Sequence, residues 1–183
     1  PHFQPIVRLV DGSTVGYEAL IRWRHPVRGL LLPLDFLGLA EESGSVEQID
    51  WLMFDKTCEH IRALVTEGQY VTFNLSPRHF RSTDLPQRFL ELLARHGIDP
   101  SSARVEVTEG TLLENPDQVC SMIAELRAGG VDGVLQLDLA GAREADVFVS
   151  EADIAAFEEI AALAADRDHL GRFCRVLFEE SLC

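Results

Sequence analysis

The feature that most constrains the fold is an alternation of strand-like and helix-like segments along the middle of the chain. Residues 70–75 (YVTFNL), 104–108 (RVEVT) and 134–139 (VLQLDL) are rich in β-branched and aromatic side chains. Amphipathic stretches at 85–96 and 116–128 separate them, and each ends at a glycine, Gly97 or Gly129. Strand and helix alternating every ~30 residues is typical of βα units with a parallel sheet.

The chain begins differently, with two strand-like segments at 3–10 and 15–23 around Asp11-Gly12-Ser13. So short a turn can join only antiparallel strands. Helices are predicted next at 35–42, where Asp35 is able to cap the start, and at 46–66. The last quarter, residues 142–169, reads as one helix with an acidic outer face, and further strands are expected at 147–149 and 175–178.

Composition limits the function classes. Thirty acidic against sixteen basic residues give a net charge of −14, which argues against binding to duplex nucleic acid. Apolar runs such as residues 30–32 and 160–165 are far shorter than the ~20 residues of a membrane span. Four dispersed cysteines without a CxxC pair favour reduced thiols and a cytoplasmic location. The chain starts at Pro1 without an initiator Met, so we expect a single domain, residues 1–183, from a longer protein.

Four polar side chains lie at or near strand ends where an apolar one would be less costly. They are Glu18, Asn74, Glu106 and Asp138. Any one of them alone would more simply face solvent or cap a loop. Together they suggest oxygen ligands converging on a hard divalent cation, Mg²⁺ or Mn²⁺, because burying an unpartnered carboxylate costs several kcal/mol or more.

At this point the motifs resemble a known family. FQPIV, YEALIRWRHP, the pair Pro33 and Phe36 ahead of LAEESG, FNLSPRHF and VEVTEG occur in the order and spacing of the EAL domain of bacterial cyclic-di-GMP signalling. The resemblance covers about residues 1–130, and residues 131–183 diverge. It implies a TIM-like (β/α) barrel, incomplete or modified here because eight βα units need about 250 residues, with an antiparallel first strand pair.

The resemblance also implies roles for individual residues. Glu18, Asn74 and Glu106 match the family's metal ligands, and Asp138 is a further candidate. Gln4 resembles the glutamine that contacts a guanine edge, while Leu20, through its backbone, and Arg22 resemble the pair that holds the ligand phosphate. Glu109 is similar to a glutamate that supports the loop after the next strand.

The departure from the family lies in the last third. Where the family has LDDFGTG, this chain reads LQLDLAG. Either Asp138 replaces the first aspartate and Leu139 the second, or LQLD matches a later strand and the segment is missing; both alignments remove the aspartate pair. The lysine that activates water in active members has no match, since Lys56, the only lysine, lies in a predicted helix.

These departures predict a catalytically impaired module with no catalytic residue assigned. It would act as a cyclic-di-GMP receptor or regulatory interaction domain, with weak Mg²⁺ or Mn²⁺ binding and a possible homodimer. The alternative is an active metal-dependent phosphodiesterase that hydrolyses cyclic di-GMP to pGpG.

Overall fold

The chain opens with the antiparallel hairpin that its sequence predicts. The computed structural model describes residues 1–8, 11–108, 111, 116–137 and 145–148. Strand β1 (His2–Val7) runs antiparallel to β2 (Thr14–Leu20), with Gln4 opposite Glu18. The turn between them contains Gly12 at φ +70°, a left-handed conformation that glycine adopts without steric cost.

The parallel part of the sheet follows from the βα alternation. Strands β5 (Tyr70–Asn74), β6 (Ala103–Thr108) and β7 (Asp132–Leu137) lie side by side and parallel, giving the order β1-β2-β5-β6-β7-β8. Strand β8 (Ala145–Phe148) pairs antiparallel to β7. The strand expected at 147–149 is confirmed by β8 at 147–148. The helix expected across 142–169 is wrong at 145–148, because this stretch extends the sheet. The other residues of that helix, and the strand expected at 175–178, lie outside the described chain. The result is an incomplete α/β fold with a mixed sheet.

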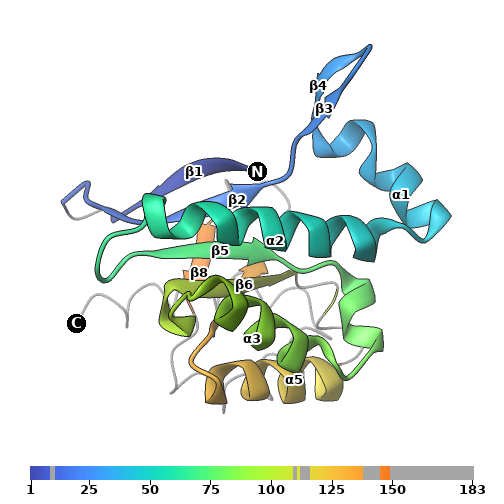
Figure 1. Cartoon of the computed structure of the whole chain (residues 1–183). Coiled ribbons are helices and arrows are strands. Elements are labelled where there is room, and N and C mark those ends of the chain that lie inside the picture. Colours follow the sequence, from blue (N-terminus) through green and yellow to red (C-terminus); the bar gives the residue numbers. More distant parts are fainter. Residues whose placement is uncertain (9–10, 109–110, 112–115, 138–144, 149–183) are drawn as a thin grey trace, which may run out of the picture.

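Three helices cover one face of this sheet: α2 (Val46–Leu64), α3 (Leu85–His96) and α5 (Pro116–Ala128) (Figure 1). The core between the helices and strands centres on three aromatic rings. Phe73 of β5 meets Phe89 of α3 at 5.1 Å and Phe54 of α2 at 5.7 Å between ring centroids, both nearly perpendicular. Edge-to-face packing of this kind adds to the free energy that burial supplies. It fixes α2 and α3 against the middle of the sheet. Short 3₁₀ turns, η2 (Pro77–Arg81) and η3 (Pro100–Ser102), follow β5 and α3.

A small lobe, defined here as residues 22–43, projects from the sheet (Figure 1). It contains a second hairpin, β3 (Trp23–His25) and β4 (Gly29–Leu31), then the turn η1 (Pro33–Asp35) and helix α1 (Leu37–Ser43). The sequence predicted one strand through residue 23 and one helix over 35–42. The strand instead ends at Leu20, and the carboxylate of Asp35 accepts a hydrogen bond from the Leu32 amide at 2.8 Å, closing η1 before α1 begins.

Within the described residues, the helices are all too short or too polar to cross a bilayer.

Candidate metal and ligand site

Three of the four predicted metal ligands come together at the ends of neighbouring strands. Asn74 of β5 lies opposite Glu106 of β6, and Glu18 of β2 lies opposite Thr72, two residues before Asn74. The Asn74 side-chain amide donates a hydrogen bond to the Glu18 carboxylate at 3.2 Å. Glu106 is only 4% exposed. Because parallel strands end at the same edge of a sheet, their register alone brings these oxygen-bearing side chains to one place.

These side chains open into a cavity of about 340 Å³ at the junction of the sheet, α2 and the lobe. This volume lies at the lower end of the range for small-molecule sites. The strands supply Glu18, Ala19, Leu20, Phe73, Asn74, Glu106 and Thr108. The segments that follow β2 and β5 supply Ile21, Leu75, Ser76 and Pro77. The lobe supplies Pro33, Leu37 and Glu41. The cavity therefore combines a carboxylate and amide edge with an apolar wall.

Helix α2 forms one wall of the cavity, and this wall was missed from the sequence. Asp50, Met53, Phe54 and Thr57 line the cavity at the i, i+3, i+4, i+7 spacing of one helix face. The sequence predicted a helix over 46–66, but none of these four residues was recognised as part of a site. Polar residues on an otherwise apolar helix face were the available signal.

Asp50 is held by a buried histidine. The Nε2 of His79, in η2, lies 3.0 Å from the Asp50 carboxylate, and the His79 side chain is 1% exposed. The histidine ring also stands edge-on to Trp51 at 5.6 Å. This contact ties the segment after Asn74 to α2, so both sides of the cavity are fixed to each other.

Two hydroxyl groups at the cavity wall are buried without a hydrogen-bond partner among the described residues. They are Thr57 Oγ1 and Ser76 Oγ. A buried hydroxyl without a partner costs roughly 1–3 kcal/mol. Both groups are thus available to hydrogen-bond whatever occupies the cavity.

The remaining predicted site residues divide into three groups. Leu20 lines the cavity, as expected for a residue that offers its backbone to a ligand. Gln4 is exposed on β1 and shares a sheet face with Glu18, the residue opposite it. Arg22 is half-buried just beyond β2, and its Nη1 donates a hydrogen bond to the Ile21 carbonyl at 2.7 Å. Neither Gln4 nor Arg22 is part of the cavity lining. Asp138 and Glu109 lie outside the described residues.

The donor set suits a hard cation but is sparse. Glu18, Asn74 and Glu106 offer only oxygen ligands, which Mg²⁺ and Mn²⁺ prefer. The described part of the chain has no group of three or more His, Cys, Asp or Glu side chains placed to hold a metal ion. Among the described residues, the oxygen donors at this edge of the sheet are therefore two carboxylates and one amide.

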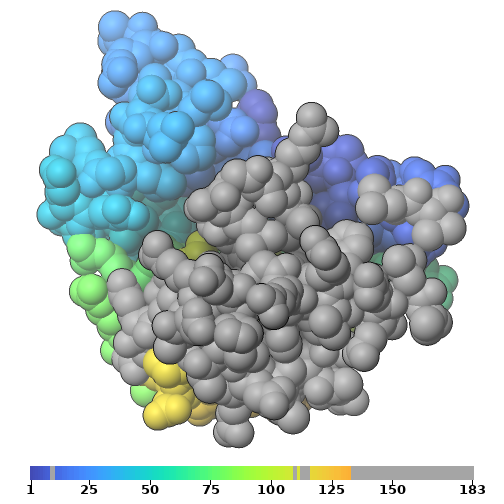
Figure 2. Space-filling model, turned by 180° about the vertical axis from the view of Figure 1, so that it is seen from behind, coloured from blue at the N-terminus to red at the C-terminus, as the bar shows by residue number. Residues whose placement is uncertain are grey.

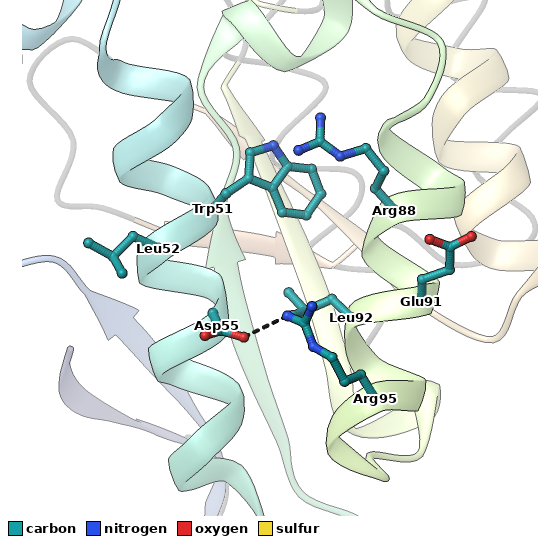
Figure 3. Close-up of a pocket in the computed structure, with 7 residues that line it drawn as sticks. All are labelled: Trp51, Leu52, Asp55, Arg88, Glu91, Leu92 and Arg95. Carbon is teal, nitrogen blue, oxygen red and sulfur yellow. Dashed lines mark hydrogen bonds and ion pairs between the residues drawn. The ribbon is translucent and has the colours of Figure 1, made fainter.

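A larger groove of about 550 Å³ lies between α2 and α3, on the helical face (Figure 3). Its charges pair with one another: Arg95 contacts Asp55 at 2.7 Å, and the Arg88 guanidinium lies 4.2 Å from the centre of the Trp51 ring. Because these groups already satisfy each other, the groove is a weaker candidate for a ligand site than the cavity at the strand ends.

Comparisons with known proteins agree with the motifs. The family model described as "EAL domain" matches residues 1–146. The chain is 36% identical over 133 residues to the bifunctional diguanylate cyclase/cyclic di-GMP phosphodiesterase MucR of Pseudomonas aeruginosa, and 36% identical over 133 residues to the cyclic di-GMP phosphodiesterase NbdA of the same organism. These matches cover 71% of this chain but only 19% and 17% of those proteins.

Solved structures give the same result. The MucR phosphodiesterase in complex with c-di-GMP has a TM-score of 0.69 and 32% identity, covering 79% of this chain and 59% of that chain. The EAL domain of Pseudomonas aeruginosa FimX bound to c-di-GMP has a TM-score of 0.66 at 20% identity, covering 73% of this chain and 54% of that one, and supports the fold alone. With its strand-end carboxylates, antiparallel first hairpin and family match over most of its length, the chain belongs to the EAL domain family.

Proposed function

We propose that this chain is a cyclic-di-GMP receptor, an EAL domain that binds the dinucleotide and has lost the chemistry to hydrolyse it. The observation that carries the proposal is the cavity where Glu18, Asn74 and Glu106 meet Leu20, because the part of the fold that would bind a ligand is present. The structure of MucR in complex with c-di-GMP supports the choice of ligand.

Each group around the cavity would have a distinct part in binding. Glu18, Asn74 and Glu106 would hold one Mg²⁺ or Mn²⁺ weakly, and that cation would offset the negative charge of a ligand phosphate. The apolar wall would exclude water from one base, while the Thr57 and Ser76 hydroxyls would hydrogen-bond its polar edge. Arg22, next to the cavity wall, would donate to a phosphate through its planar fork.

The expected loss of catalysis depends on the only lysine. Lys56 is exposed on α2 and is not part of the cavity lining, so the chain has no lysine to orient or activate an attacking water there. The aspartate pair of the family is also replaced in the sequence around Asp138 and Leu139. Removing a water-activating group commonly lowers the reaction rate about 10²- to 10⁴-fold.

The alternative function is an active phosphodiesterase that converts cyclic di-GMP to pGpG. Its support is the 36% identity to MucR and NbdA, both named as cyclic di-GMP phosphodiesterases. The chain spans less than a fifth of each of these proteins, so phosphodiesterase activity of this chain is only the alternative proposal. The missing lysine favours the receptor.

Calorimetric titration with cyclic di-GMP, with and without Mg²⁺, followed by product analysis for pGpG, separates these functions. The receptor predicts heat of binding and intact ligand after prolonged incubation with metal. Release of pGpG at a rate near 1 s⁻¹, about a typical enzymatic turnover, would establish the enzyme instead. Absence of any binding heat under both conditions would refute both.

A further inference from the structure

A buried histidine behind the cavity wall holds the carboxylate that α2 brings to the cavity. The side chain of His79, in η2, is 1% exposed, and that of Asp50, on α2, is 14% exposed. Their contact joins Nε2 of the ring to Oδ2 of the carboxylate at 3.0 Å. An ionised carboxylate only accepts hydrogen bonds, so this contact requires the ring proton on Nε2. His79 therefore donates to Asp50, while only Asp50 is part of the cavity lining.

The histidine ring has little freedom to leave this position. It stands edge-on to Trp51 at 5.6 Å and lies 5.6 Å from Phe54, measured between ring centroids. The next residue along η2, Arg78, donates from its guanidinium to the Glu41 carbonyl of α1 at 2.6 Å. Figure 2 shows the end of α1 and the η2 segment side by side at one edge of the molecule. Packing against α2 and anchoring to α1 thus fix the group that donates to Asp50.

The carboxylate of Asp50 keeps acceptor capacity toward the cavity. The histidine engages Oδ2, whereas a carboxylate has about four lone-pair sites in all. Since a carboxylate repels phosphate, its partner in a bound dinucleotide is a base. Guanine presents its N1–H and 2-amino donors side by side, and a carboxylate can accept both. Adenine presents one amino donor beside a ring acceptor, so it cannot make the same pair of bonds.

We propose that His79 is a positioning residue that sets base specificity. It holds Asp50 in the orientation in which the carboxylate accepts from the N1–H and 2-amino groups of a guanine. This inference rests on the proposed function, because it takes cyclic di-GMP as the ligand. The histidine makes no contact with the ligand itself, so its effect passes through Asp50. Loss of His79 should therefore weaken recognition of the base edge in particular.

A ligand that differs only at the base edge tests this role. Cyclic di-inosine monophosphate lacks the 2-amino groups of cyclic di-GMP and keeps N1–H. Isothermal titration calorimetry of the wild-type chain should show about tenfold weaker binding of this analogue, since a hydrogen bond to a charged acceptor is lost. His79→Leu should reduce the preference to about twofold or less, because the carboxylate is no longer held. His79→Gln restores an N–H donor and should recover most of the preference. A purely structural role would weaken both ligands equally and leave their ratio unchanged.

A second histidine–aspartate pair on the same helix provides the matched control. His96 Nε2 lies 2.9 Å from the Asp55 carboxylate, and neither residue lines the cavity. His96→Leu removes an equivalent bond from α2 and should leave the preference for guanine unchanged. A double-mutant cycle then tests whether His79 acts through Asp50. In an Asp50→Ala background, His79→Leu should cause no further loss of cyclic-di-GMP affinity.

The outcomes separate this inference from the proposed function. Circular dichroism checks that each variant is folded; should His79→Leu unfold, Asp50→Ala must lose the preference and His79→Gln must keep it. A preference that survives in Asp50→Ala or in folded His79→Leu would overturn the role of His79 while leaving the receptor proposal intact. Equal binding of both ligands by the wild-type chain would do the same. A wild-type chain that binds neither ligand would overturn both proposals.

Discussion

Replacing Arg22 with alanine is the sharpest test of how a ligand would use this site. The guanidinium lies one residue beyond the cavity wall and is positioned by its 2.7 Å bond to the Ile21 carbonyl. A charge-assisted hydrogen bond to a phosphate contributes about 1.5–3 kcal/mol. At about 1.4 kcal/mol for each tenfold change, Arg22→Ala should weaken cyclic-di-GMP binding roughly 10- to 150-fold.

The effect on folding should be much smaller than the effect on binding. The bond that Arg22 makes is to its immediate neighbour and is only partly buried, so its loss should cost less than about 1 kcal/mol of unfolding free energy. Isothermal titration calorimetry measures the first quantity and urea unfolding the second. Arg22→Lys should fall between wild type and alanine, because an ammonium group cannot donate the paired bonds of a guanidinium.

A neighbouring arginine provides the matched control. Arg24 is exposed on β3, and Arg24→Ala changes the net charge by the same amount without touching the cavity, so binding should stay within about twofold of wild type. We further expect Gln4→Ala to weaken binding more than Glu18→Gln, because Glu18 would act through a weakly held cation. Unchanged affinity in Arg22→Ala, or an equal loss in Arg24→Ala, would refute the proposed binding mode.

Three further predictions concern stability and reactivity. Gly16→Ala should destabilise the chain by about 1–3 kcal/mol in urea unfolding, because the added Cβ would lie 2.7 Å from the Tyr70 carbonyl oxygen; an unchanged midpoint would show that β2 and β5 separate easily. Burial raises the pKa of the Cys58 thiol to about 12, so iodoacetamide at neutral pH should leave Cys58 unlabelled by mass spectrometry until the chain unfolds, and rapid native labelling would contradict this. The hydrogen bond from His96 and the guanidinium of Arg95 lower the pKa of Asp55. The stability that the ionised Asp55 carboxylate contributes is therefore present above the ordinary carboxyl pKa and is lost as the pH falls through the lowered value. Asp55→Asn should remove that part of the acid dependence, less than about 1 kcal/mol at this exposed pair, and identical acid unfolding profiles of wild type and variant would contradict it.

Local patterns were enough to predict most elements of the sheet and its helical layer. The Asp11–Ser13 turn required an antiparallel first pair, and the β-branched segments before and after glycine-terminated helices required parallel β5, β6 and β7. Because parallel strands end at one edge, the same patterns predict that Glu18, Asn74 and Glu106 lie together, and all three line one cavity. Periodicity and turn chemistry are short-range properties, so the sequence carries them directly.

Only the tertiary structure decided what surrounds those residues. Asp50 and Thr57 reach the cavity because the Phe54, Phe73 and Phe89 contacts fix α2 against the sheet. Their place on an otherwise apolar helix face was visible in the sequence, but the cavity that they line was not. The β3–β4 hairpin was likewise missed, because three-residue strands are too short to show a period. The strand of β8 was expected at 147–149, but its antiparallel pairing with β7 was not. The exposure of a side chain depends on what packs against it in the folded chain. The exposed leucines of the lobe could therefore be identified only from the tertiary structure.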